Sequence, residues 1–136
     1  MSILLVDDDD VAAEAVVRGL AKHAMRCPIA IAEDGRAALQ VLRGTHPTSH
    51  IAKPYLVLLD LNMPRMNGFE FLRELRMDVE LHATVVFVLT TSDSKVERAK
   101  AYQENIAGYM VKAAVGPQFA RLAQLLQSYQ MAVSLP

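Results

Sequence analysis

Side chains that could take part in phosphoryl transfer follow four separate apolar stretches of the chain. Three carboxylates brought together repel one another unless a cation neutralises them, and Mg²⁺ is a hard cation that binds carboxylate oxygens and water. A lysine adds a compact positive charge that can bind a phosphoryl oxygen, and a threonine adds a hydroxyl donor. These residues are Asp7, Asp8, Asp60, Thr90 and Lys112. Asp60 among them could act as the nucleophile and form an aspartyl phosphate.

Asp60 stands at the end of the apolar run Tyr55–Leu59 and in front of a turn tract that contains Pro64 and Gly68. An apolar run of this length bounded by turn residues predicts a buried strand. In an open α/β sheet, functional groups lie just beyond the carboxyl ends of the strands. One aspartate after one strand is more commonly a simple loop cap. The functional interpretation therefore depends on the other strand ends.

The acidic run Asp7–Asp10 follows the apolar stretch Ile3–Val6. Asp9 or Asp10 can cap the helix that comes next and favour its positive end. Capping needs one or two aspartates and not four, which leaves Asp7 and Asp8 as candidate metal ligands. The apolar face of this helix is expected to comprise Ala13, Val16, Val17, Leu20 and Ala24.

Five apolar stretches alternate with five helical patterns. The predicted strands are Ile3–Val6, Pro28–Ala32, Tyr55–Leu59, Thr84–Leu89 and Ile106–Val111. The second helix is expected to end at about Arg43, and the third to run from about Asn67 to Met77. The fourth is expected to begin at a capping box, Ser94–Glu97, and to end at about Glu104. The fifth is expected to run from about Pro117 to Tyr129 or Gln130. This order predicts an α/β fold with a doubly wound five-stranded parallel sheet, flavodoxin-like with strand order 2-1-3-4-5, and five helices. The ends of strands one, three, four and five would then lie side by side.

Composition limits the class of protein. The 136 residues are 52% hydrophobic, which predicts one globular domain over residues 1–136. The net charge is −1 and no basic cluster stands out, so we expect no nucleic-acid partner. No signal leader is visible, and no apolar run approaches the roughly 20 residues that cross a bilayer, so we expect no membrane association. The single cysteine, Cys27, suits a cytoplasmic location.

As a set, these motifs resemble the receiver domain of two-component response regulators along the whole chain. The resemblance is carried by Asp7-Asp8, the stretch Asp60…Met63-Pro64…Gly68, Thr90, and Gly108-Tyr109…Lys112. Four segments are more similar in sequence to one subgroup of this family: residues 58–68, the loop before Lys53-Pro54, residues 90–92 and residues 107–109. That subgroup contains the single-domain regulators paired with bacterial and cyanobacterial phytochrome histidine kinases.

The resemblance implies a role for each site residue. Asp60 would accept a phosphoryl group from the phosphohistidine of a kinase, phytochrome-type by the narrower likeness. Asp8 and Asp60 would ligate Mg²⁺ directly with the backbone carbonyl of Asn62, while Asp7 would act mainly through water. Lys112 would contact the phosphoryl oxygens. The protein would not be an enzyme in the ordinary sense, because it would catalyse only its own phosphorylation and autodephosphorylation.

The resemblance also implies a conformational switch. Thr90 would move towards the phosphoryl group and let the ring of Tyr109 turn inward, which shifts the population between two packings. Asn62 and Ser92 occupy positions that tune the lifetime of the phosphate in the family. Neither residue is acidic.

One departure from the family pattern lies after the active-site lysine, where the family usually has proline and this chain has Ala113. A cis bond without proline costs about 2.5–4 kcal/mol. The loop is therefore either trans and reshaped, or cis under strain.

The last helix offers a wide apolar stripe, extended by the tail of the chain: Phe119, Leu122, Ala123, Leu125, Leu126, Tyr129, Met131, Val133 and Leu135. Excess apolar surface suggests a partner. We predict a homodimer through this helix and its neighbours. The competing interpretation is a wide face wrapped on the core with a frayed tail.

Two other functions compete with the phosphorylated receiver. A degenerate receiver that binds partners without phosphorylation is suggested only by Ala113. A phosphohydrolase of the haloacid-dehalogenase type also uses an aspartate nucleophile and Mg²⁺, but it needs a second aspartate where this chain has Asn62. A dinucleotide-binding domain is disfavoured because no glycine-rich turn follows the first strand.

Overall fold

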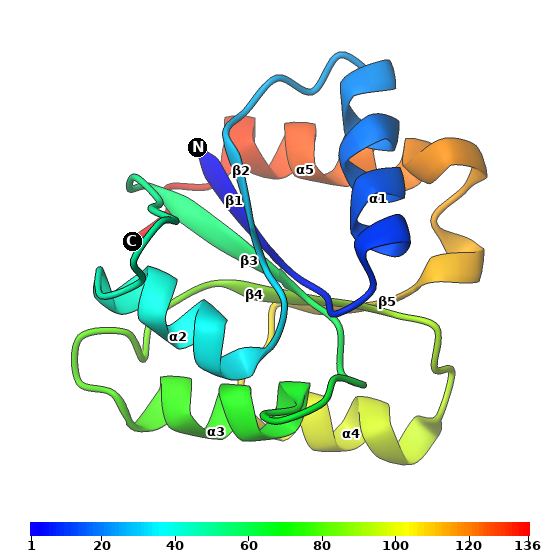
Figure 1. The fold of residues 1–136 in the computed structure, drawn as a ribbon. Coiled ribbons are helices and arrows are strands. Elements are labelled where there is room, and N and C mark those ends of the chain that lie inside the picture. The colour runs from blue at the N-terminus through cyan, green and yellow to red at the C-terminus, as the bar shows by residue number, and fades with distance from the viewer.

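The computed structural model describes residues 1–136, in which five strands alternate with five α-helices (Figure 1). The strands are β1 (Ser2–Val6), β2 (Ile29–Ala32), β3 (Tyr55–Leu59), β4 (Val86–Thr90) and β5 (Gly108–Val111). The helices are α1 (Asp10–Lys22), α2 (Gly35–Arg43), α3 (Gly68–Met77), α4 (Lys95–Gln103) and α5 (Ala120–Ala132). Two short 3₁₀ turns, Lys112–Ala114 and Pro117–Phe119, lie between β5 and α5.

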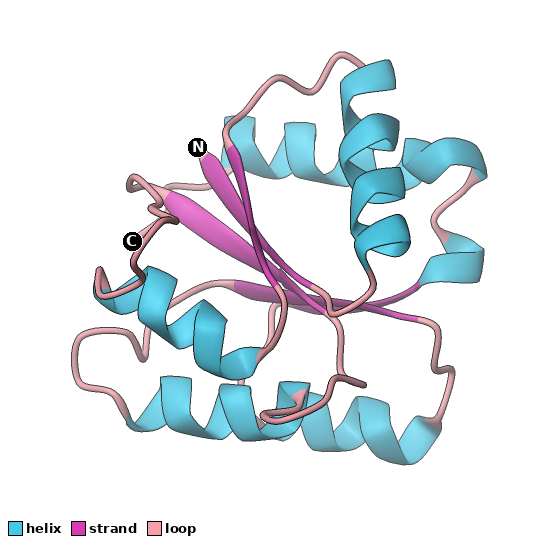
Figure 2. Ribbon diagram, viewed as in Figure 1, coloured by secondary structure: helices cyan, strands magenta, loops and turns pink.

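All five strands are parallel, and their order in the sheet is β2-β1-β3-β4-β5. This confirms the predicted doubly wound fold. Helices α1 and α5 cover one face of the sheet, and α2, α3 and α4 cover the other (Figure 2). None of these helices combines the length and the apolar character that crossing a lipid bilayer requires.

Apart from Ser2 and Thr90, the residues of the central strands are apolar because these strands are buried on both faces. Every residue of β1, β3 and β4 is buried. Alternate side chains point to opposite faces, so Leu4 and Leu59 join the core beneath α2 and α3, while Leu5 and Leu58 join the core beneath α1 and α5. The sheet is thereby fixed in register, and the positions of its strand ends are fixed with it.

Local side chains stabilise the first turns of α1 to α3, and at α1 the cap is one of the two that the sequence indicated. The Asp9 carboxylate accepts hydrogen bonds from the backbone N–H groups of Val11 and Ala12. Asn67 and Glu70 form a complete capping box at α3. In α1 the predicted apolar face is correct up to Leu20 but not at Ala24, which lies beyond the helix, is exposed and has a φ of 60°.

The fourth strand begins later than predicted and includes Thr90. Thr84 belongs to the preceding turn, because both its backbone N–H and its hydroxyl donate to the carbonyl of Leu81. Pairing within the sheet therefore starts at Val86. At the other end Thr90 is paired with Val111 and is completely buried.

The start of the last helix was predicted wrongly at Pro117. Gln118 and Phe119 have φ values of 53° and 61°, and the regular helix begins only at Ala120. This turn packs against α1 at Gly19, where a side-chain carbon would lie 2.6 Å from the carbonyl oxygen of Gln118. The contact between two segments far apart in the sequence stabilises a local conformation that the proline pattern did not indicate.

Candidate functional site

The register of the sheet brings the site residues together. Val6 of β1 pairs with Leu59 of β3, and the backbone N–H of Asp60 donates to the Val6 carbonyl at 2.9 Å. Asp7 and Asp60 therefore leave the sheet next to each other. Thr90 of β4 pairs with Val111 of β5, which places Lys112 just beyond the same edge.

Asp7, Asp8 and Asp60 form a compact acidic cluster. One carboxylate oxygen of each residue lies within 4.8 Å of the others. Asp7 is buried, Asp60 is half-buried and Asp8 is exposed, so the cluster opens to solvent on one side. Three carboxylates facing a single ammonium group leave an excess of negative charge. A hard divalent cation fits both this charge and this donor set.

The ammonium group of Lys112 lies on Asp7. Its Nζ donates to a carboxylate oxygen of Asp7 at 3.1 Å, and the other oxygen of Asp7 accepts from the backbone N–H of Asp9 at 3.0 Å. The Lys112 side chain is only 18% exposed. The bond between Lys112 and Ala113 is trans, since the only cis peptide bond of the chain joins Lys53 and Pro54. A 3₁₀ turn over Lys112–Ala114 takes the place of the proline-containing loop.

Burial raises the pKa of the Asp60 carboxyl group above its ordinary value, and the negative charge of Asp7 raises this pKa further. The positive charge of Lys112 and hydrogen bonds from Asn62 N–H and the Thr90 hydroxyl oppose the rise but do not cancel it. The protein thus holds Asp60 in surroundings where its negative charge is incompletely neutralised. A bound cation would complete the neutralisation.

The turn after Asp60 is shaped by Gly68. A side-chain carbon at this position would lie 2.7 Å from the Asp60 carbonyl oxygen and 2.7 Å from Cα of Leu61. The backbone N–H of Gly68 donates to the Leu61 carbonyl at 3.0 Å. Only glycine permits this approach. Asn62 lies exposed between these residues, and its backbone N–H points at the Asp60 carboxylate at 3.5 Å.

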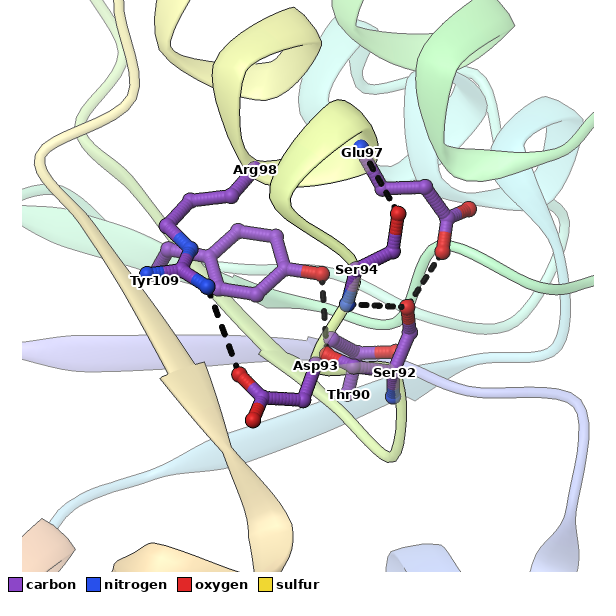
Figure 3. Close-up of polar contacts among 7 residues, drawn as sticks. All are labelled: Thr90, Ser92, Asp93, Ser94, Glu97, Arg98 and Tyr109. Atoms are coloured by element: carbon purple, nitrogen blue, oxygen red, sulfur yellow. Dashed lines mark hydrogen bonds and ion pairs between the residues drawn. The ribbon is translucent and has the colours of Figure 1, made fainter.

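Thr90 and Tyr109 both form hydrogen bonds with the backbone of Ser92, which lies in the loop between β4 and α4 (Figure 3). The backbone N–H of Ser92 donates to the Thr90 hydroxyl oxygen at 3.3 Å, and the Tyr109 hydroxyl donates to the Ser92 carbonyl at 3.0 Å. Tyr109 is half-buried, and its ring packs against the core beneath α2 and α3.

The contacts that two residues of this region make with the loop and with Tyr109 were not predicted from the sequence. Glu97 was predicted to close a capping box, but its carboxylate binds the Ser92 hydroxyl. Arg98 lies over the Tyr109 ring, 5.9 Å from its centre, and pairs with Asp93. The sequence gives only a weak indication of the contact between Ser92 and Glu97. Ser92 precedes Glu97 by five residues, and the conformation of the turn between them decides whether their side chains meet.

Comparison with known proteins identifies relatives along almost the whole chain. The family described as the response regulator receiver domain matches residues 3–132. A protein named probable methanogenesis regulatory protein FilR2, from Methanothrix harundinacea, is 32% identical over 93% of this chain and 81% of its own length. The response regulator Rcp1 of Synechocystis sp. is 30% identical over 98% of this chain and 92% of its own length.

Solved structures of response regulators have the same fold as this chain. The Mn²⁺-bound form of Rcp1 superposes with a TM-score of 0.81 at 30% identity, covering 99% of this chain and 98% of that one. The phosphorylated cyanobacterial phytochrome response regulator RcpA gives a TM-score of 0.84 at 27% identity, covering 99% and 97%.

Proposed function

Because the chain belongs to the response regulator receiver domain family, and so works in two-component, phosphorylation-dependent signalling with a histidine kinase as its partner, we propose that Asp60 is its phosphoryl acceptor. The observation that carries this proposal is the acidic cluster, in which Asp60 lies within 4.8 Å of Asp7 and Asp8 at an edge of the sheet open to solvent. Asp60 is the member of the cluster that combines partial exposure with a position at the end of the central strand β3.

Receiver domains bind a divalent metal, as the Mn²⁺-bound Rcp1 illustrates, and we propose Mg²⁺ for this chain. Asp8, Asp60 and the backbone carbonyl of Asn62 would hold the ion, with Asp7 acting through water. When bound, the ion would neutralise charge on the carboxylates and on the phosphoryl oxygens. The fit of the donor set supports this assignment, because all the side-chain ligands offer oxygen.

The chain's own residues then carry the transfer. A carboxylate oxygen of Asp60 forms a bond to phosphorus while the bond from phosphorus to the kinase imidazole nitrogen breaks, and the electron pair leaves with the imidazole. Lys112 exchanges part of its interaction with Asp7 for a phosphoryl oxygen. The Thr90 hydroxyl donates to another. Both contacts stabilise the negative charge of the incoming phosphoryl oxygens.

We further propose that the domain releases its phosphate by autodephosphorylation, and that Asn62 and Ser92 influence the rate. Neither side chain can act as a carboxylate base towards an attacking water. We propose that the kinase partner is of the phytochrome type, because the chain is similar to Rcp1 and to RcpA, and RcpA is described as a phytochrome response regulator. We propose the cytoplasm as the location of the protein.

The apolar surface of α5 supports the proposal of a homodimer. Leu122, Ala123 and Leu126 are buried against the sheet, as a face wrapped on the core requires. Leu125 remains 38% exposed and borders a groove of about 330 Å³ between β5 and α5. Met131, at the end of the helix, is 88% exposed. A second copy that contacts Leu125 and Met131 would remove this surface from water.

Incubation with acetyl phosphate and Mg²⁺, followed by intact mass measurement, tests the function. The protein should gain one phosphoryl group, and Asp60→Asn should abolish the gain. Asp10→Asn is the matched control, because Asp10 is exposed beside the cluster without belonging to it. An unmodified wild-type protein would favour an interaction module instead, and steady release of phosphate from unrelated esters would favour a hydrolase.

A further inference from the structure

Ser92 connects four groups through three of its atoms (Figure 3). Its N–H donates to the Thr90 hydroxyl oxygen, and its carbonyl accepts from the Tyr109 hydroxyl. Its own hydroxyl accepts from the backbone N–H of Ser94 at 3.3 Å and donates to the carboxylate of Glu97. Both residues expected to switch on phosphorylation therefore depend on where Ser92 is held.

The Glu97 carboxylate has a partner that its position in the helix does not require. Glu97 is the third residue of α4, and its backbone N–H donates to the hydroxyl oxygen of the N-cap Ser94 at 3.2 Å, as in an ordinary helix start. Glu70 stands at the same position of α3, and its carboxylate returns to the backbone N–H of Asn67 at 3.1 Å. In α4 the equivalent carboxylate leaves the helix terminus and binds Ser92.

We propose that Glu97 is a positioning residue for phosphoryl transfer at Asp60, and this rests on the function proposed above. A hydrogen bond to a carboxylate is stronger than one between neutral groups, so Glu97 fixes the Ser92 side chain and with it the loop backbone. The fixed N–H of Ser92 occupies one acceptor site of the Thr90 hydroxyl. The hydrogen of that hydroxyl is then directed away from the loop and towards Asp60.

The ring of Tyr109 supplies a second attachment of the same loop to α4. Its hydroxyl is bonded to the Ser92 carbonyl, and the guanidinium of Arg98 lies over its face. Arg98 also reaches Asp93 in the loop at 3.4 Å. Glu97 and Arg98, which are consecutive residues of α4, thus both bind the loop between β4 and α4. The first turn of α4 is thereby coupled to the Thr90 hydroxyl, which is proposed to contact the phosphoryl oxygens.

The test compares rate constants of phosphorylation by acetyl phosphate at saturating Mg²⁺. Glu97→Ala should lower the rate constant about three- to tenfold, the factor that one net hydrogen bond represents. Glu97→Gln keeps an oxygen acceptor without the charge and should recover at least half of the loss on a logarithmic scale. Ser92→Ala should slow phosphorylation to the level of Glu97→Ala, and the double variant should be no slower than either.

Glu70→Ala is the matched control, because it removes a carboxylate from the same position of α3, where the carboxylate binds Asn67 and not Ser92. Its rate constant should equal that of the wild type even where its loss of unfolding stability equals that of Glu97→Ala. Equal rates for Glu97→Ala and Glu70→Ala, or additive effects of the changes at residues 92 and 97, would overturn the role of Glu97. A wild-type protein that accepts no phosphate would instead overturn the proposed function itself.

Discussion

At the scale of single residues, Asp60 is held in surroundings that oppose its negative charge. Its pKa is raised by burial and by Asp7, so the folded chain binds the Asp60 proton more tightly than the unfolded chain does. The stability of the metal-free protein therefore falls as the pH rises from the ordinary pKa of aspartate to the raised one, and the loss persists at higher pH.

We expect Asp60→Asn to unfold at a higher urea concentration than the wild type at pH 7 in the presence of a chelator. The free energy of unfolding should rise by about 1 kcal/mol, which is the repulsion between two like charges a few ångströms apart in water. The gain should shrink as the pH is lowered through the same interval. Urea titrations between pH 4 and pH 7 measure it.

Asp34→Asn should behave in the opposite way and serves as the control. Burial works against ionisation of Asp34, but hydrogen bonds from the Ala37 N–H and the Arg65 guanidinium lower its pKa below the ordinary value. Its charge therefore stabilises the fold at neutral pH, and this contribution is lost as the pH falls. A stability loss on replacing Asp60, parallel to that on replacing Asp34, would contradict the electrostatic account of the cluster.

The acidic cluster could be predicted because its members lie within two residues of the end of an apolar strand, and parallel strands end at one edge of the sheet. The contacts of Ser92 could not. Whether its hydroxyl meets Glu97 or Thr90 depends on the turn over residues 92–94, which no periodic pattern describes. The contact of Lys112 with Asp7 was likewise beyond prediction, since two loop conformations were compatible with Ala113.

At the scale of whole elements, Arg76 joins the end of α3 to two loops. Its guanidinium donates to the carbonyls of His82 and Thr84 before β4, and to the carbonyls of Glu104 and Asn105 before β5. Burial lowers the pKa of Arg76, yet it stays a cation at neutral pH. One charged side chain thus satisfies four backbone acceptors that would otherwise need water.

We expect Arg76→Ala to reduce the free energy of unfolding by about 2 to 4 kcal/mol, because four backbone acceptors lose a charged donor and part of them is shielded from solvent. Arg73→Ala is the matched control, since Arg73 is an exposed arginine of the same helix. Its effect should stay within about 0.5 kcal/mol. Chemical denaturation of the three proteins measures both values, and equal losses would show that Arg76 has no special role.

Predictability differed between elements for physical reasons. Strand β3 matched its predicted limits because a run of five buried apolar residues allows no other pairing. The start of α5 was missed because Pro117 favours a first helical turn, whereas packing of Phe119 against Gly19 determines the conformation. The capping box of α3 formed in full and that of α4 only in half, although both sequences fit the pattern.

At the scale of the whole molecule, the proposed phosphoryl-accepting edge and the proposed partner surface belong to one continuous segment of the structure. Lys112 directly follows β5 and begins the first of two short turns that lead into α5. Leu125 lies on α5 beside the groove formed with β5. A rearrangement at Lys112 could therefore reach the proposed dimer surface along the backbone segment that joins Lys112 to Leu125, without a long pathway through the core.

This arrangement leads to a prediction about assembly. The wild-type protein should sediment as a dimer at tens of micromolar, and Leu125→Glu should weaken the dimer by about tenfold or more, because it places an uncompensated charge in an apolar contact. Met77→Glu is the control, as Met77 is an exposed apolar residue of α3 on the opposite side of the sheet. Sedimentation equilibrium with and without a phosphate mimic distinguishes the cases. A wild-type monomer under both conditions would exclude the dimer and favour the competing interpretation, a wide apolar face wrapped on the core with a frayed tail.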